Sequence, residues 1–139
     1  MNVLLIDDDE TYHDLFNSSL KRLGHSYFGL YSGIGASKLV ADEDIGIVAL
    51  DIFMPDKEGL STLTDLRVYN PTLPIYAISG DEFYLKLAED LGACGSMQKP
   101  ITFDGIQDLV DGKRRNCTDC RAKRQGHGQC SRQYPDNTR

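Results

Sequence analysis

Short apolar runs and longer segments of helical spacing alternate along the chain. Each apolar run has the length of a strand and lies near Gly, Asp or Pro residues, as strands commonly do. Between the runs, apolar residues recur at intervals of three or four positions, which predicts a helix after each strand. The predicted strands are Val3–Ile6, Ser26–Tyr31, Ile45–Leu50, Pro74–Ile78 and Cys94–Met97.

The predicted helices have recognisable start and stop signals. Asp and Thr are good N-caps, whereas Gly and Pro favour helix ends. The helices are expected after Asp9 up to Gly24, over Ala36–Ala41, from Leu60 to Asn70–Pro71, after Asp81 up to Gly92, and after Thr102 through Leu109.

Strands that alternate with helices need crossover connections, which predicts a five-stranded parallel sheet with helices on both faces. The first and third strands are almost continuously apolar, as expected when both faces of a strand are buried. Ligands of such α/β folds bind at the carboxyl ends of the strands. The search for chemistry therefore starts at those ends.

The charge is divided between two parts of the chain. Residues 1–111 contain seven Lys and Arg and 19 Asp and Glu, which gives a net charge of −12. Residues 112–139 contain eight Lys and Arg and two Asp, which gives a net charge of +6. The 139 residues therefore divide into one predicted domain, 1–111, and a basic tail, 112–139. No stretch has the character of a signal peptide or a membrane helix, so we expect a cytoplasmic location.

Reactive polar residues follow four of the five predicted strands. Asp7–Asp9 follow the first strand, Asp51 follows the third, Ser79 and Gly80 follow the fourth, and Lys99-Pro100 follows the fifth. Carboxylates held together repel one another unless a cation lies among them, and Mg²⁺ suits such oxygen ligands. With Lys99 and the Ser79 hydroxyl added, the set suits a phosphoryl group, which a carboxylate can accept as an aspartyl phosphate.

These residues resemble the receiver domain of two-component response regulators, the CheY-like receivers with a flavodoxin-like strand order. The resemblance rests on Leu4-Leu-Ile-Asp-Asp-Asp-Glu, on Asp51-Ile-Phe-Met-Pro-Asp-Lys-Glu-Gly-Leu60, on Ile78-Ser-Gly and on Lys99-Pro100, and it covers about residues 1–111. One such motif is a weak signal, but four at the expected strand ends are a strong one.

The resemblance implies a role for each matching residue. Asp51 would accept a phosphoryl group from a histidine kinase or phosphotransfer protein, and Asp7, Asp8, Asp51 and the backbone carbonyl of Phe53 would hold Mg²⁺. Ser79, Gly80 and Lys99 would bind the phosphoryl group, and Pro100 would follow Lys99 through a cis bond. The fourth helix, fifth strand and fifth helix would form the output surface toward a downstream protein, with phosphorylation-dependent homodimerisation a further expectation. Phosphorylation and dephosphorylation would be self-catalysed in a signalling protein that is not an enzyme.

Two positions depart from the family pattern. Ser96 occupies the position where receivers usually carry an aromatic switch residue, which predicts weaker conformational coupling. Phe53, two positions after Asp51, either shields an acyl phosphate from water or contributes only its carbonyl. Phe53 also disfavours an Asp-nucleophile phosphatase of the haloacid-dehalogenase type, which needs a second Asp at that position.

The tail contains Cys117, Cys120, His127 and Cys130, a set that could bind Zn²⁺, although the spacing fits no strong pattern. The low apolar content favours a disordered tail, which could reach nucleic acid or an acidic surface through charge alone. Cys94 is expected to pack as a small apolar residue, and His13 to lie at the surface.

The leading function is therefore a phosphoacceptor receiver, either stand-alone or cut from a longer protein. A receiver-like docking module that works without phosphorylation is the first alternative, and the phosphatase is the second. Neither the cognate kinase nor the stimulus can be read from the residues.

Overall fold

The computed structural model describes residues 1–53 and 59–114, in which five strands alternate with five helices. The strands are β1 (Asn2–Ile6), β2 (Ser26–Leu30), β3 (Ile47–Asp51), β4 (Ile75–Ser79) and β5 (Gly95–Gln98). The helices are α1 (Glu10–Leu23), α2 (Ala36–Asp42), α3 (Gly59–Tyr69), α4 (Glu82–Asp90) and α5 (Phe103–Val110). All ten predicted elements are present. The strand boundaries differ from the predicted ones by at most two residues.

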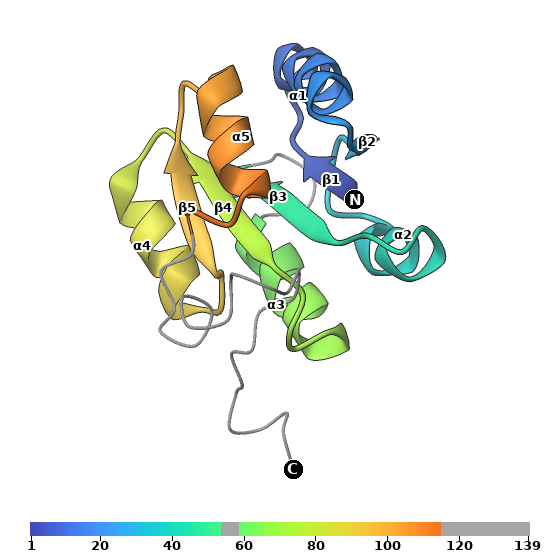
Figure 1. Cartoon of the computed structure of the whole chain (residues 1–139). Helices are drawn as coiled ribbons and strands as arrows, with labels where there is room; N and C mark the ends of the chain where they lie inside the picture. The colour runs from blue at the N-terminus through green and yellow to red at the C-terminus, as the bar shows by residue number, and fades with distance from the viewer. Residues whose placement is uncertain (54–58, 115–139) are drawn as a thin grey trace.

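The strands form one parallel sheet in the order β2-β1-β3-β4-β5. Helices α1 and α5 lie together on one face, and α2, α3 and α4 cover the other (Figure 1). The predicted fold class is therefore confirmed. In the described ranges, no helix is both long enough and apolar enough to cross a membrane.

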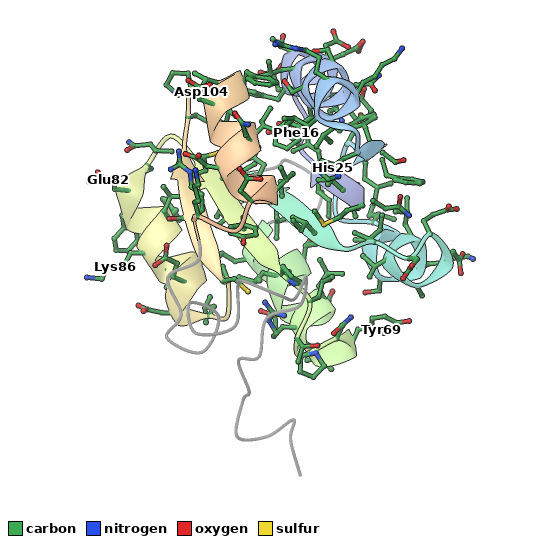
Figure 2. The ribbon with its side chains drawn as sticks, viewed as in Figure 1. Phe16, His25, Tyr69, Glu82, Lys86 and Asp104 are labelled. Atoms are coloured by element: carbon green, nitrogen blue, oxygen red, sulfur yellow. The ribbon has the colours of Figure 1, made fainter. Side chains whose placement is uncertain are left out.

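Alternating side chains of the sheet divide between two apolar cores. In β1, Leu4 and Ile6 belong to the core beneath α2, α3 and α4, whereas Val3 and Leu5 belong to the core beneath α1 and α5. Phe16 extends from α1 into that second core (Figure 2). Strands β3 and β4 are buried along their whole length, because helices cover both of their faces.

Local hydrogen bonds account for the helix boundaries. The side chains of Asp9, Asp81 and Thr102 cap α1, α4 and α5 by accepting hydrogen bonds from the backbone N–H groups of Thr11, Phe83 and Gly105. Gly24 ends α1 in the left-handed region at φ 83°. The caps expected at Asp81 and Thr102 are confirmed, as is the stop at Gly24.

The expectation that His13 lies at the surface was wrong. This side chain is only 2% exposed and faces β2 from α1. The polar neighbours of His13 in the sequence gave no sign of this, because its partner Tyr27 lies 14 positions away. Cys94 is buried and packs in the interior as expected.

Candidate functional site

The carboxyl ends of β1, β3, β4 and β5 bring the predicted site residues to one edge of the sheet. Asp7 directly follows β1, Asp51 is the last residue of β3, and Lys99 follows β5. The Lys99 ammonium nitrogen lies 3.1 Å from Asp7 Oδ2 and 3.5 Å from Asp51 Oδ2. One ammonium group thus faces two buried carboxylates.

Backbone amides orient both of these carboxylates. The N–H of Asp9 donates to Asp7 Oδ1 over 2.8 Å, and the N–H of Phe53 donates to Asp51 Oδ1 over 3.2 Å. In each case Oδ1 is held by the chain and Oδ2 faces the ammonium group of Lys99. Asp7 Oδ2 is buried and makes no hydrogen bond of good geometry, although it forms the ion pair with Lys99.

The electrostatics of the site favour a cation. Burial and, after it, the nearby charge of Asp7 raise the pKa of Asp51 to about 6, because Lys99 and the Phe53 amide, which lower it, offset only part of their effect. Burial acts to lower the pKa of Lys99, but the attraction of Asp7 and Asp51 outweighs it and leaves that pKa raised. One ammonium group therefore does not fully compensate the carboxylates.

Asp8 adds a third carboxylate to the edge. Oxygen atoms of Asp7, Asp8 and Asp51 lie within 4.8 Å of one another, with Asp8 exposed and the other two buried. A buried carboxylate oxygen without a hydrogen bond, together with two further carboxylates, is a donor set suited to a hard divalent cation such as Mg²⁺.

Ser79 and Gly80 connect the site to α4 and β5. The Ser79 hydroxyl is buried and accepts a hydrogen bond from the N–H of Asp81 over 3.1 Å, just before α4 begins. Lys99 N–H donates to the Ser79 carbonyl over 2.9 Å, and the Gln98 side chain donates to the Gly80 carbonyl over 3.1 Å. The Lys99–Pro100 peptide bond is cis, as expected.

Gly59 packs against the site, although the sequence analysis named it only within the motif Asp51–Leu60 and gave it no role. A Cβ at this position would lie 2.2 Å from the Asp51 carbonyl oxygen and 2.4 Å from Ile52 Cα. The first residue of α3 thus packs directly against the backbone of the candidate phosphoacceptor, which only a residue without a side chain allows.

The two departures from the family pattern both touch α4. Ser96 donates a hydrogen bond to Glu89 Oε2 over 2.6 Å and lines a cavity of about 480 Å³. The Phe53 ring, half exposed beside the site, packs edge-on against Tyr84, with ring centroids 4.3 Å apart. Figure 2 shows Glu82 and Lys86, which also line this cavity, on α4.

The proposed zinc ligands Cys117, Cys120, His127 and Cys130 lie outside the described residues, as does most of the basic tail. Positions 54–58, which complete the motif after Asp51, lie outside them too.

This parallel sheet with an acidic edge defines a receiver-type α/β domain. Solved structures of the same fold include the chemotaxis protein CheY4 of Vibrio cholerae, with a TM-score of 0.72 and 18% identity over 78% of this chain and 94% of that one. The receiver domain of NtrX from Brucella abortus has a TM-score of 0.71 and 27% identity over 76% of this chain and 91% of that one.

The family profile described as "Response regulator receiver domain" matches residues 3–111, and the chain belongs to this family. Among curated relatives, the transcriptional regulatory protein MalR of Bacillus subtilis is 30% identical over 83% of this chain and 51% of its own length. The transcriptional regulatory protein ZraR of Salmonella typhimurium is 26% identical over 80% of this chain and 26% of its own length. The chain thus spans about a quarter to a half of these relatives.

Proposed function

We propose that this receiver domain accepts a phosphoryl group on Asp51 and uses the new charge to alter its α4–β5–α5 surface. The observation that carries the proposal is the pairing of Lys99 with both Asp7 and Asp51, at 3.1 and 3.5 Å, beside the exposed Asp8. A docking module that works without phosphorylation has no need for this costly burial of like charges.

The nucleophile is Asp51 Oδ2, because Oδ1 already accepts the Phe53 amide hydrogen bond. This oxygen attacks the phosphorus of a phosphohistidine or a small phosphodonor. A P–O bond forms as the P–N or P–O bond to the donor breaks, and the leaving group takes the electron pair and then a proton. A histidine kinase or phosphotransfer protein is the donor that the family implies.

Three carboxylates with one ammonium would repel an incoming phosphoryl group, so the proposal includes Mg²⁺ held by Asp7, Asp8, Asp51 and the carbonyl of Phe53. When bound, Mg²⁺ supplies charge neutralisation for phosphoryl transfer. Lys99 stabilises the product, because its ammonium already lies within ion-pair distance of Asp51. The Ser79 hydroxyl, which accepts a hydrogen bond from Asp81 N–H, would donate its own hydrogen to a phosphoryl oxygen.

Phosphorylation adds about −1.5 to −2 charge and new acceptor oxygens. Movement of Ser79 toward them would disturb its bond to the Asp81 amide, at the residue that caps α4. We therefore assign the output surface to α4, β5 and α5. Residues 1–111 would be the receiver, with residues 112–139 as a separate basic segment.

The test is incubation of the chain with acetyl phosphate and Mg²⁺, followed by intact-mass measurement. We expect one phosphoryl group per chain, labile to hydroxylamine, that is absent in Asp51→Asn and without Mg²⁺. Stable absence of uptake by the wild type would favour the docking module, whereas repeated turnover of phosphomonoesters would favour a phosphatase. Asp14→Asn, which changes an exposed carboxylate on α1, is the matched control.

A further inference from the structure

His13 is a buried histidine whose two ring nitrogens both have partners. Nε2 lies 2.7 Å from the backbone carbonyl oxygen of Asp7, and Nδ1 contacts the hydroxyl of Tyr27. A carbonyl oxygen can only accept, so Nε2 carries the hydrogen and donates it. Nδ1 is then the acceptor, and the Tyr27 O–H donates to it.

The hydrogen-bonding order runs in one direction, from Tyr27 through His13 to Asp7. Burial raises the pKa of Tyr27 to about 12, which keeps its hydroxyl protonated as a donor. The Tyr31 ring stacks on the imidazole, with ring centroids 4.1 Å apart. The ring is thereby fixed in both its orientation and its tautomer.

Strand β2 leaves room for the contact between His13 and Tyr27 because its residue 29 is glycine. A Cβ on Gly29 would lie 2.1 Å from the Tyr27 hydroxyl oxygen and 2.7 Å from His13 Nδ1. Any larger residue would push these groups apart. The pair therefore depends on three positions from two elements: His13 of α1, and Tyr27 and Gly29 of β2.

The carbonyl that His13 holds lies at the end of a ladder. The register between β1 and β2 ends at Ile6 and Leu30, and the Asp7 N–H donates to the Leu30 carbonyl over 3.1 Å. The Asp7 carbonyl lies past the last strand pair of β1 and β2, and its hydrogen-bond donor is His13 instead of a strand residue. The Asp9 amide also holds Oδ1 of Asp7, so Asp7 is fixed at its N–H, its carbonyl and one carboxylate oxygen.

We propose that His13 is a positioning residue for the metal site: its Nε2–H holds the Asp7 carbonyl and so sets where the carboxylates of Asp7 and Asp8 lie. Partners that orient metal-ligating carboxylates commonly affect metal affinity without touching the metal. This inference rests on the proposed Mg²⁺ site. The hydrogen-bond partners of His13 are the Asp7 carbonyl and the Tyr27 hydroxyl, so its proposed effect is on the geometry of the metal ligands.

The test compares Mg²⁺ dissociation constants of full-chain variants, measured from amide shifts of Asp8 and Asp9 during titration with Mg²⁺ alone. His13→Leu removes both hydrogen bonds, whereas His13→Gln keeps an N–H donor at about the reach of Nε2. We expect the Leu variant to bind Mg²⁺ about fivefold more weakly, the loss of about one hydrogen bond, and the Gln variant to bind within about twofold of the wild type.

His13→Asn provides the comparison if the Leu variant fails to fold. Its amide is too short to reach Asp7 but can still accept from Tyr27, so we expect it to bind Mg²⁺ more weakly than His13→Gln. Gly29→Ala, which displaces the Tyr27 hydroxyl, should weaken binding in the same direction, and Tyr31→Phe should match the wild type.

Two results would overturn the proposal. One is an unchanged Mg²⁺ affinity in His13→Leu together with lower stability in urea, which would make His13 a structural residue only. The other is an equal loss of Mg²⁺ affinity in His13→Gln and His13→Asn. A wild type that binds no Mg²⁺ would instead remove the metal site itself, and the positioning role with it; that outcome is distinct because it appears before any variant is compared.

Discussion

Asp51 should destabilise the protein at neutral pH whenever no divalent cation is bound. It is one of two buried carboxylates that face a single ammonium, and its pKa is raised to about 6. Asp51→Asn removes the charge, retains an oxygen for the Phe53 amide, and leaves Lys99 paired with Asp7. We therefore expect Asp51→Asn to raise the free energy of unfolding in the absence of Mg²⁺.

The magnitude follows from the size of the pKa shift. A rise from 3.8 to about 6 is worth about 3 kcal/mol at 1.36 kcal/mol per pKa unit. The site opens to solvent beside the exposed Asp8, and screening there reduces the effect, so we expect a gain of about 1–3 kcal/mol.

The upward direction of the Asp51 pKa shift gives stability a characteristic pH dependence. Because the pKa of Asp51 is higher in the folded state than in the unfolded state, its contribution to stability is fully present below the unfolded value of 3.8 and is lost as the pH rises through about 6. The difference between Asp51→Asn and the wild type should therefore be small near pH 4 and complete above about pH 7.

The assay is urea unfolding followed by circular dichroism, in EDTA, across this pH range. Asp14→Asn on the exposed side of α1 is the control and should follow the wild-type pH profile. Addition of Mg²⁺ should stabilise the wild type more than the variant and narrow the gap, since a ligand stabilises the state that binds it. A variant that is less stable than the wild type in EDTA at neutral pH would refute the reasoning, as would a difference that does not vary with pH.

Three further changes test the neighbours of the site. Gly59→Ala forces a Cβ against the backbone of Asp51 and should cost about 1–3 kcal/mol in urea unfolding, as overpacking does, and a cost near zero would contradict the close contact. Phe53→Asn should shorten the half-life of the aspartyl phosphate, measured by loss of intact-mass label, if the aromatic ring shields the acyl phosphate from water; equal half-lives would leave only the Phe53 carbonyl with a role. Ser96→Tyr should enlarge the amide shifts of α4 and β5 on addition of beryllofluoride, and equal shifts in both proteins would contradict weak coupling at Ser96.

The sequence could predict the strands and the strand-end residues because both are local signals. An apolar run such as Val3–Ile6 has few alternatives to a buried strand, and parallel strands bring their carboxyl ends to one edge whatever the details of packing. The convergence of Asp7, Asp51 and Lys99 followed from topology alone.

Features that depend on contacts across elements could not be predicted in this way. His13 was expected at the surface because its neighbours in the helix are polar, but burial depends on Tyr27 and Gly29 in β2. The raised pKa of Asp51 likewise depends on how deeply β3 is covered and on the distance to Asp7, neither of which leaves a pattern in the sequence.

The charge balance of the site explains why a phosphoryl group there should act on α4. Three carboxylates and one ammonium leave a formal excess of two negative charges, which a divalent cation would cancel. The proposed phosphorylation of Asp51 would replace one carboxylate charge by about −1.5 to −2 and restore a negative excess. Hydrogen-bond donors would then turn toward the new oxygens.

Two of those donors, the Phe53 amide and the Ser79 hydroxyl, belong to residues that contact α4 or the residue that caps it. The Phe53 amide is bonded to Asp51 Oδ1, and the Phe53 ring packs on Tyr84 of that helix. The Ser79 hydroxyl is bonded to the amide of Asp81, whose side chain caps the same helix. We therefore expect a change at Asp51 to reach the first turn of α4 through both paths. Neither of these two paths passes through Ser96, so we expect both to be retained without an aromatic ring there, and we expect the ring introduced by Ser96→Tyr to add a further coupling.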